Sequence, residues 1–269
     1  MTDKQVTVCF IDDSPFERSL FEEVFGATPG WRLVIAETFA AAQDSLGTAI
    51  PLLWLLDLWG NDPQGPGNSE ILSPQEVQRA AEGIPGLETV WAGLDEFPGD
   101  KINEFLKRLY TVVLGWQELF LRAAQAADQT RAYGLYNLAQ VRAHYPGTAA
   151  LAYTRKSQSQ DLTAFLAAGG DGAFLKPHGP DDQAILARTK AQAPALVRQM
   201  TEILNRRLAE SLLGSSLTLL GSEGGYLYSL AGALLRRSPP PKPQLANLDP
   251  YLARYVEEIL IWLEVRPNP

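Results

Sequence analysis

Residues 51–57, PLLWLLD, place an apolar side chain at nearly every position of a short run that ends in Asp57. A strand with helices over both of its faces has this composition, whereas a strand with one solvated face alternates apolar and polar side chains. Two similar short runs, QVTVCFI and WRLVIAE, come earlier, and amphipathic helical segments separate the three. This β-α-β-α-β order predicts a parallel, doubly wound sheet within residues 5–60.

The same alternation resumes near residue 134. A helical segment, YGLYNLAQVRAHYPG, is followed by the strand AALAYTR, the helix SQDLTAFLAAGG and the strand DGAFLKP. A long helix is then expected from about Asp181 to Leu213. Together the two parts predict an α/β fold with a doubly wound, five-stranded parallel sheet.

A long segment, from about residue 62 to 132, interrupts the alternation. It begins in a polar Pro/Gly loop and continues into a long helical pattern with a stripe of apolar residues, Ile102, Phe105, Leu106, Leu109, Val113, Trp116 and Phe120. Structureless loops of this length are uncommon in compact domains, so we expect a folded helical insertion. We expect it beside the sheet edge that carries Asp57. The stripe either packs on its own chain or forms a homodimer surface.

Composition limits the classes of function. The net charge of −8 and the pI near 4.9 argue against a broad phosphate-binding surface, and residues 201–269 contain no basic helix-turn-helix pattern. We therefore expect no clear nucleic-acid binding. The longest apolar runs are too short to span a bilayer and MTDKQVTV lacks an apolar signal region, which predicts a cytoplasmic protein. The predicted organisation is a domain at 1–200, interrupted by the insertion, and a helical extension at 201–269.

Reactive side chains follow the predicted strands at the points where they end. They are Asp12, Asp13, Asp57, Thr154 and Lys176. The carboxyl ends of parallel strands meet at one edge of a sheet. Three carboxylates gathered there repel one another unless a hard cation such as Mg²⁺ neutralises them. With a hydroxyl and an ammonium group added, the set meets the electrostatic needs of phosphoryl transfer.

These segments, in this order, resemble the receiver domain of two-component response regulators over roughly residues 5–60 and 134–200. The resemblance implies a flavodoxin-like receiver fold in which Asp57 is the phosphoacceptor. A histidine kinase, a phosphotransfer protein or a small phosphodonor would supply the phosphoryl group. Asp12, Asp13 and Asp57 would hold Mg²⁺ together with the Trp59 backbone carbonyl.

The resemblance also implies that Thr154 and Lys176 contact the phosphoryl group, and that the Lys176–Pro177 peptide bond is cis. Some positions depart from the family pattern. Arg155 stands where a small residue is usual, and Trp59 is large and apolar. Ala173 occupies the position of the aromatic switch, with Phe174 one place later. We predict that Arg155 and Trp59 gate the site and slow the formation or loss of a phosphorylated state, or that Arg155 pairs with an acid of the insertion.

Other functions stay open at this point. The chain could be a pseudo-receiver, an interaction module with a receiver fold that is seldom or never phosphorylated. An aspartate-nucleophile phosphatase would need a second Asp two residues after Asp57, where Trp59 stands. We therefore expect no enzymatic activity beyond self-phosphorylation and self-dephosphorylation. The sequence does not identify the downstream partner.

Overall fold

A computed structural model of the chain describes residues 4–61, 69–156, 159–219 and 221–266. The start of the predicted insertion, 62–68, and the chain end, 267–269, lie outside the described residues. The main sheet is parallel and has the strand order β2-β1-β3-β6-β7. Its strands are β1 (Val6–Ile11), β2 (Trp31–Ala36), β3 (Leu53–Leu56), β6 (Ala149–Thr154) and β7 (Gly172–Leu175). This is the order of flavodoxin-like receivers, so the predicted fold is confirmed.

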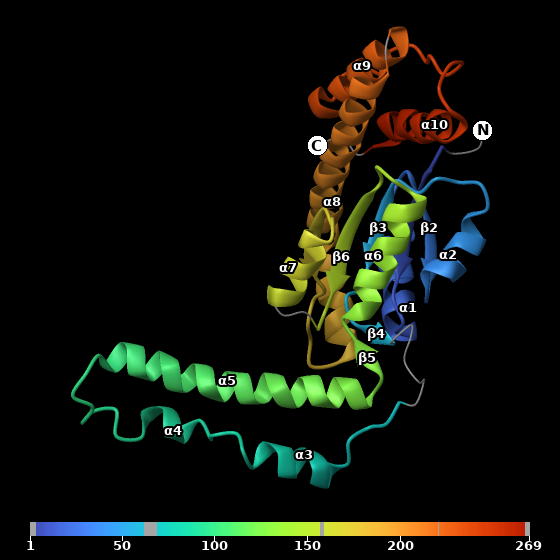
Figure 1. Cartoon of the computed structure of the whole chain (residues 1–269). Helices are drawn as coiled ribbons and strands as arrows, with labels where there is room; N and C mark the ends of the chain where they lie inside the picture. Colours follow the sequence, from blue (N-terminus) through green and yellow to red (C-terminus); the bar gives the residue numbers. More distant parts are fainter. Residues whose placement is uncertain (1–3, 62–68, 157–158, 220, 267–269) are drawn as a thin grey trace. The chain divides into compact units, whose positions relative to one another are not determined.

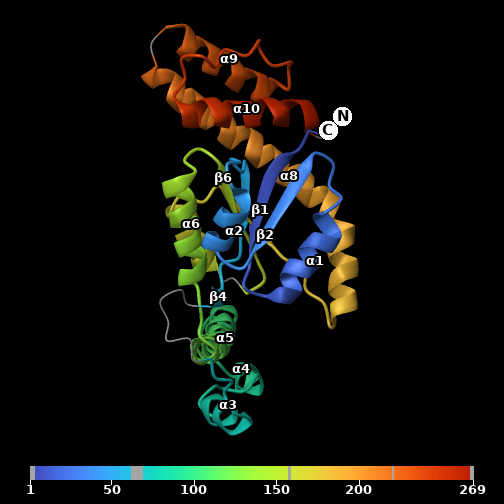
Figure 2. The ribbon, with the colours of Figure 1, turned by 90° about the vertical axis from the view of Figure 1, so that its right-hand side faces the viewer.

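Helices cover both faces of this sheet, as the uniformly apolar β3 requires (Figures 1 and 2). One face carries α1 (Pro15–Phe25) and the first part of α8 (Asp182–Thr218). The other carries α2 (Phe39–Leu46), α6 (Ala132–His144) and, packed beside α6, α7 (Ser159–Ala167). The side chains of Ser14 and Thr38 accept hydrogen bonds from the first turns of α1 and α2, and these caps fix where each helix begins.

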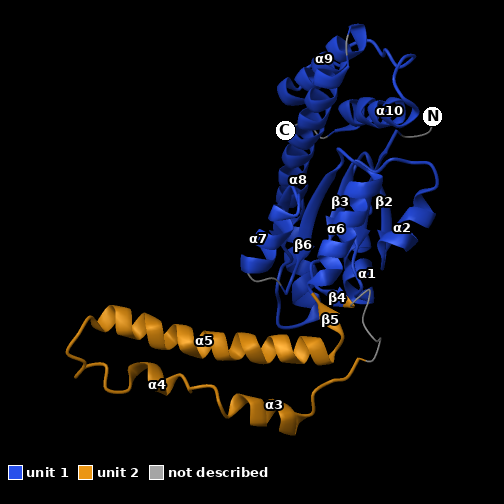
Figure 3. Ribbon diagram, in the orientation of Figure 1, with its two compact units in different colours: residues 1–60, 131–269 blue, residues 61–130 orange. Residues whose placement is uncertain are grey.

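Residues 61–130 form a second compact unit (Figure 3). It contains α3 (Pro74–Ala81), α4 (Glu88–Trp91) and α5 (Lys101–Ala126), which confirms that the insertion is helical. A complete capping box between Ser73 and Glu76 starts α3. A Cβ on Gly115 would lie 2.8 Å from the Ile84 side chain, so the glycine lets α5 approach this part of its own unit closely.

Two short strands missing from the sequence prediction stand at the ends of the insertion. These are β4 (Gly60–Asn61) and β5 (Gln129–Thr130), which pair in a separate two-stranded sheet. The Gln129 side-chain amide donates a 2.9 Å hydrogen bond to Asn61 Oδ1. Strands of two residues carry no periodic pattern, so the sequence gives no signal for them.

The chain ends in α9 (Ser222–Arg236) and α10 (Pro250–Val265), packed with the second half of α8. The Trp262 indole donates to Asn205 of α8 at 2.8 Å, and the Tyr255 hydroxyl donates to the carbonyl of Gly147 at 2.8 Å. Gly147 comes just before β6, so α10 lies at the amino ends of the strands, opposite Asp57 (Figure 1). The predicted boundary at residue 200 falls inside α8, which is continuous there. No described helix is long and apolar enough to cross a membrane.

Candidate metal and phosphoacceptor site

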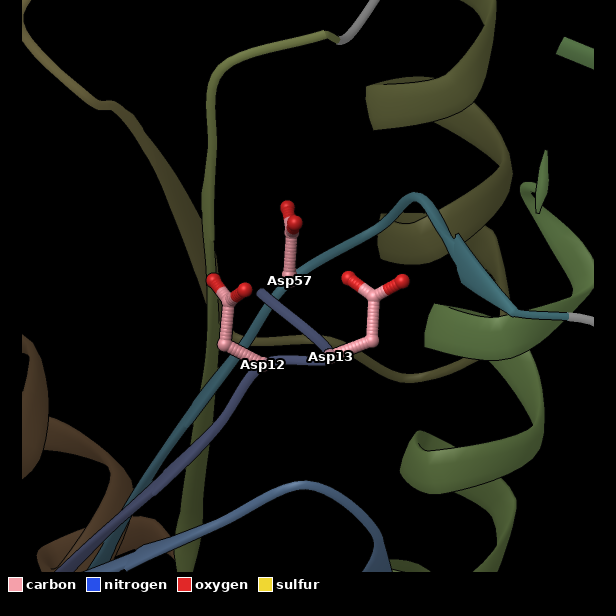
Figure 4. Close-up of side chains that lie close together, drawn as sticks. All are labelled: Asp12, Asp13 and Asp57. Carbon is pink, nitrogen blue, oxygen red and sulfur yellow. The ribbon is translucent and has the colours of Figure 1, made fainter. Parts of the chain in front are cut away.

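The three predicted carboxylates meet at the carboxyl edge of the sheet. Asp12 and Asp13 follow β1, and Asp57 follows the neighbouring β3 (Figure 4). One carboxylate oxygen from each lies within 4.8 Å of the others. The Asp57 backbone N–H donates to the carbonyl of Ile11 at 2.9 Å, continuing the β1–β3 hydrogen bonding. The parallel register therefore brings these side chains together, as the sequence predicts.

Lys176 brings a positive charge to this cluster from the end of β7. Its ammonium group forms an ion pair with Asp12 and lies 3.6 Å from Asp57 Oδ2. The side chain is almost completely buried, and its Nζ atom lies 5.5 Å from the centre of the Phe10 ring. A buried ammonium group is stable only when it is paired, so Lys176 and the carboxylates depend on one another.

Thr154 ends β6 beside the cluster, and its hydroxyl oxygen is buried with no hydrogen-bond partner among the described residues. The hydroxyl lies near enough to Asp57 to favour the ionised carboxyl, but it does not make a hydrogen bond of ordinary geometry. Buried hydroxyl groups are usually satisfied. The orphaned donor therefore has an unused hydrogen bond for an additional oxygen atom at this site.

Burial dominates the electrostatics of the cluster. Burial, together with the neighbouring Asp57, raises the pKa of Asp12 to about 7 against the opposing effect of Lys176. Burial likewise raises the pKa of Asp57, again against Lys176. Burial alone would lower the pKa of Lys176, but Asp57, Asp12 and Glu17 together raise it above its ordinary value. One ammonium group is thus insufficient to keep both buried carboxyls in their ordinary acidic range.

The residues present fit a hard divalent cation. The three carboxylates each offer an oxygen atom within 4.8 Å of the others, close enough to share one ion, and oxygen is the donor type that Mg²⁺, Mn²⁺ and Ca²⁺ prefer. The excess of negative charge on three acids over one lysine is what such an ion would neutralise.

Glu17 also belongs to the site, although the sequence analysis did not identify it. It lies in the first turn of α1, and its Oε2 atom is 3.6 Å from Lys176 Nζ. Its other oxygen accepts hydrogen bonds from Arg155 at 2.8 and 3.0 Å. Arg155 also donates to the carbonyl of Pro177. The expectation that Arg155 pairs with an acid of the insertion is therefore wrong, because Glu17 of α1 is its partner.

Trp59 is held by a second group that the sequence analysis missed. Its buried indole N–H donates to Asp161 Oδ2 at 3.2 Å, and Arg131 lies 3.4 Å from the other oxygen of Asp161. Near Trp59, a Cβ on Gly134 would lie 2.7 Å from the Asp57 carbonyl oxygen, so only glycine lets α6 begin this close to the segment that follows β3. The segment after Asp57 is thereby fixed from both α6 and α7.

One expectation taken from the receiver pattern meets a different structure. The Lys176–Pro177 peptide bond is trans, not cis. The trans form of an X–Pro bond is intrinsically favoured by about 0.5–1 kcal/mol, and here it leaves the Pro177 carbonyl bound to Arg155. At the switch position, Ala173 lies in β7 and the half-buried Phe174 follows it, so no aromatic side chain occupies that position.

Comparisons with known proteins find only distant structural similarity. No protein-family model and no curated protein matches the sequence. Among solved structures, a CheY-like response regulator receiver domain protein from Methanospirillum hungatei JF-1 is 12% identical, with a TM-score of 0.34. The match covers 73% of this chain and 99% of that one.

Two further matches are similarly distant. The Mn²⁺-bound form of the response regulator Rcp1 is 13% identical, with a TM-score of 0.36, over 70% of this chain and 91% of that one. A response regulator from Burkholderia pseudomallei, with a phosphorylated aspartic acid and a calcium ion, is 13% identical, with a TM-score of 0.33. That match covers 87% of this chain and 94% of the other. Functional assignment therefore depends on the site itself.

Proposed function

We propose that this chain is a response-regulator-like signalling protein that is phosphorylated on Asp57 in a Mg²⁺-dependent reaction. The observation that carries the proposal is the convergence of Asp12, Asp13 and Asp57 at one sheet edge, with Lys176 between Asp12 and Asp57. The donor would be a histidine kinase, a phosphotransfer protein or a small phosphodonor, and the phosphorylated state would act through protein–protein contacts. A cytoplasmic location stays a prediction.

In this mechanism an Asp57 carboxylate oxygen attacks the phosphorus atom of the donor. A P–O bond to Asp57 forms as the bond to the leaving nitrogen or oxygen breaks, and the leaving atom keeps the electron pair. Asp12, Asp13, Asp57 and the Trp59 carbonyl would hold Mg²⁺, whose charge offsets that of the phosphoryl oxygens. Lys176 would pair with one phosphoryl oxygen, and the unpartnered Thr154 hydroxyl would donate to another.

The experiment is incubation of the full chain with acetyl phosphate and Mg²⁺, followed by intact-mass measurement and peptide mapping. We expect one added phosphoryl group, on the peptide that contains Asp57, and none when a chelator replaces Mg²⁺. No mass change under conditions that phosphorylate a reference receiver would favour a pseudo-receiver.

That alternative, a scaffold that is rarely or never phosphorylated, has specific support. Lys176 pairs more closely with Asp12 than with Asp57, and Ala173 replaces the aromatic switch. A pseudo-receiver would keep the ion pair as a structural element. Measuring Mg²⁺ binding by calorimetry separates a phosphorylatable receiver from a pseudo-receiver, because only the phosphorylatable receiver requires the ion.

We predict that Arg155 and Trp59 slow the turnover of phosphorylated Asp57. Arg155 is anchored by Glu17, and Trp59 by Asp161, so neither side chain can move aside without breaking a hydrogen bond. Replacing both, Arg155→Ala with Trp59→Asn, should speed loss of the phosphoryl group by about tenfold, equivalent to ~1.4 kcal/mol of activation free energy. The decay is followed by intact mass after donor removal.

Arg188→Ala is the matched control, since this exposed arginine also donates to a backbone carbonyl, that of His178, but lies outside the site. Its decay rate should equal that of the wild type. Equal rates in the wild type and the double variant would show that neither Arg155 nor Trp59 gates the reaction.

A further inference from the structure

The long helix α5 of the insertion has two apolar faces, and α3 and α4 pack on one of them. Val112 and Leu119 are buried on the face toward α3 and α4. Beside them, a row of large apolar side chains stays exposed among the described residues. Ile102 is 74% exposed, Tyr110 62% and Trp116 53%, and the row also includes Leu106, Val113 and Phe120. An exposed contiguous apolar strip of this size marks an interaction surface.

The spacing along this face indicates what covers it. Its core positions are Ile102, Leu106, Leu109, Val113, Trp116 and Phe120. The four steps from Ile102 to Trp116 alternate between four and three residues and average 3.5, the spacing of a heptad, and one further step of four reaches Phe120. A repeat of 3.5 keeps a seam in line along a partner helix in a left-handed coiled coil, whereas a straight helix drifts away from such a repeat. The face is therefore suited to another long helix.

The order of side chains along the seam is self-complementary when one helix is reversed. Residues equidistant from Thr111 pair as Ile102 with Phe120, Leu106 with Trp116, and Leu109 with Val113. In an antiparallel pair, the Phe120 ring of one copy would lie opposite Ile102 of the other, and the Trp116 ring would lie opposite Leu106. A parallel copy would set Trp116 against Trp116 and Phe120 against Phe120. An isologous two-fold interface needs this kind of self-complementary patch.

The flank of the seam contains nothing that opposes self-association. On the exposed side of the seam, the residues that directly follow Ile102, Leu109 and Trp116 are all uncharged. They are Asn103, Tyr110 and Gln117. Charged residues at such flanking positions normally select the partner, and like charges there would separate two copies. The nearby Arg108 is neutralised by Glu104 and donates to the carbonyl of Ala92.

The exposed area is also sufficient for a dimer. The aromatic members of this row bury about 150–250 Å² each when fully covered, and with its three smaller aliphatic members the row offers roughly 600 Å² of exposed area per copy. Specific, stable interfaces bury about 1,200–2,000 Å² in total, so roughly 600 Å² per partner lies at the lower end of that range. We propose that α5 pairs with α5 of a second copy, antiparallel, in a two-fold dimer centred near Thr111. The proposal does not depend on phosphorylation.

Light scattering of the full chain across a concentration series tests the dimer. The wild type should be dimeric at micromolar concentrations. Leu109→Glu with Trp116→Glu places two charges per copy in the seam and should raise the dimer dissociation constant at least about a hundredfold. Thr111→Glu is the control, because this exposed residue faces away from the seam on the same helix and should leave the dimer unchanged. Circular dichroism confirms that each variant is folded.

Spin labels test the orientation. Cys9 is buried, so a cysteine introduced at Lys101 can be labelled selectively. An antiparallel pair centred near Thr111 separates the two labels by about 30 Å, since they lie twenty residues apart along the helix axis at 1.5 Å per residue. A parallel pair would give under about 20 Å.

Three results would overturn the proposal. The first is a monomeric wild type. A lower melting temperature in the double variant would then show that the seam packs within its own chain. The second is a dimer that persists in the double variant, and the third is a short distance between the labels.

Discussion

Replacing Lys176 with methionine is expected to lower the free energy of unfolding by about 3–5 kcal/mol. The ammonium group is the buried cation paired with Asp12 and close to Asp57, and its loss leaves those carboxylates without compensation. Methionine retains much of the side-chain volume between the Phe10 and Tyr153 rings, so the change reports charge more than packing. Denaturant unfolding in the presence of a chelator measures it.

Two comparisons make the result specific. Lys190→Met removes a lysine from an exposed pair with Glu23 and should cost no more than about 1 kcal/mol. Lys176→Met combined with Asp12→Asn should be more stable than Lys176→Met alone, because one uncompensated charge is removed with the other. If the two single lysine variants were equally stable, the buried cluster would not depend on Lys176.

The second large effect is expected for Asp57→Asn, which should abolish any adduct with acetyl phosphate or beryllofluoride. Asparagine has nearly the same shape and keeps an oxygen that can accept from the Leu58 N–H, a hydrogen bond of 2.9 Å in the structure. It lacks the carboxylate that attacks phosphorus. Intact mass detects the phosphoryl group, and fluorine NMR detects the beryllofluoride complex.

Asp44→Asn is the matched control, because Asp44 is an exposed acid on α2, outside the site. It should form adducts as the wild type does, at the same Mg²⁺ concentration. An adduct that survives in Asp57→Asn would move the acceptor to another residue and remove the proposed role of Asp57.

The sequence predicted the sheet because its strands carry unusually clear signals. The fully apolar β3 and the capped helices α1 and α2 are local features, and they appear in the structure where local reasoning expects them. The strand-end acids and Lys176 were predictable for the same reason, since parallel strands necessarily align their carboxyl ends.

Long-range partners were not predictable in this way. Glu17 reads as an ordinary first-turn acid of α1, and only the fold places it between Lys176 and Arg155. Asp161 lies more than a hundred residues from the indole that it holds. The trans Lys176–Pro177 bond differs from the expectation because proline accepts either isomer at a small difference in free energy.

The short β4–β5 ladder has a consequence for how this chain could have arisen. It brings the first and last residues of the insertion, Asn61 and Thr130, to adjacent strands, which in a β-ladder lie about 5 Å apart. Each residue of extended chain spans up to about 3.3–3.6 Å, so a gap of that size can be bridged by a few residues. The sheet-bearing unit therefore needs none of the intervening chain to stay connected. An ancestral loop at this point could have acquired, lost or exchanged the helical module without changing the strand order.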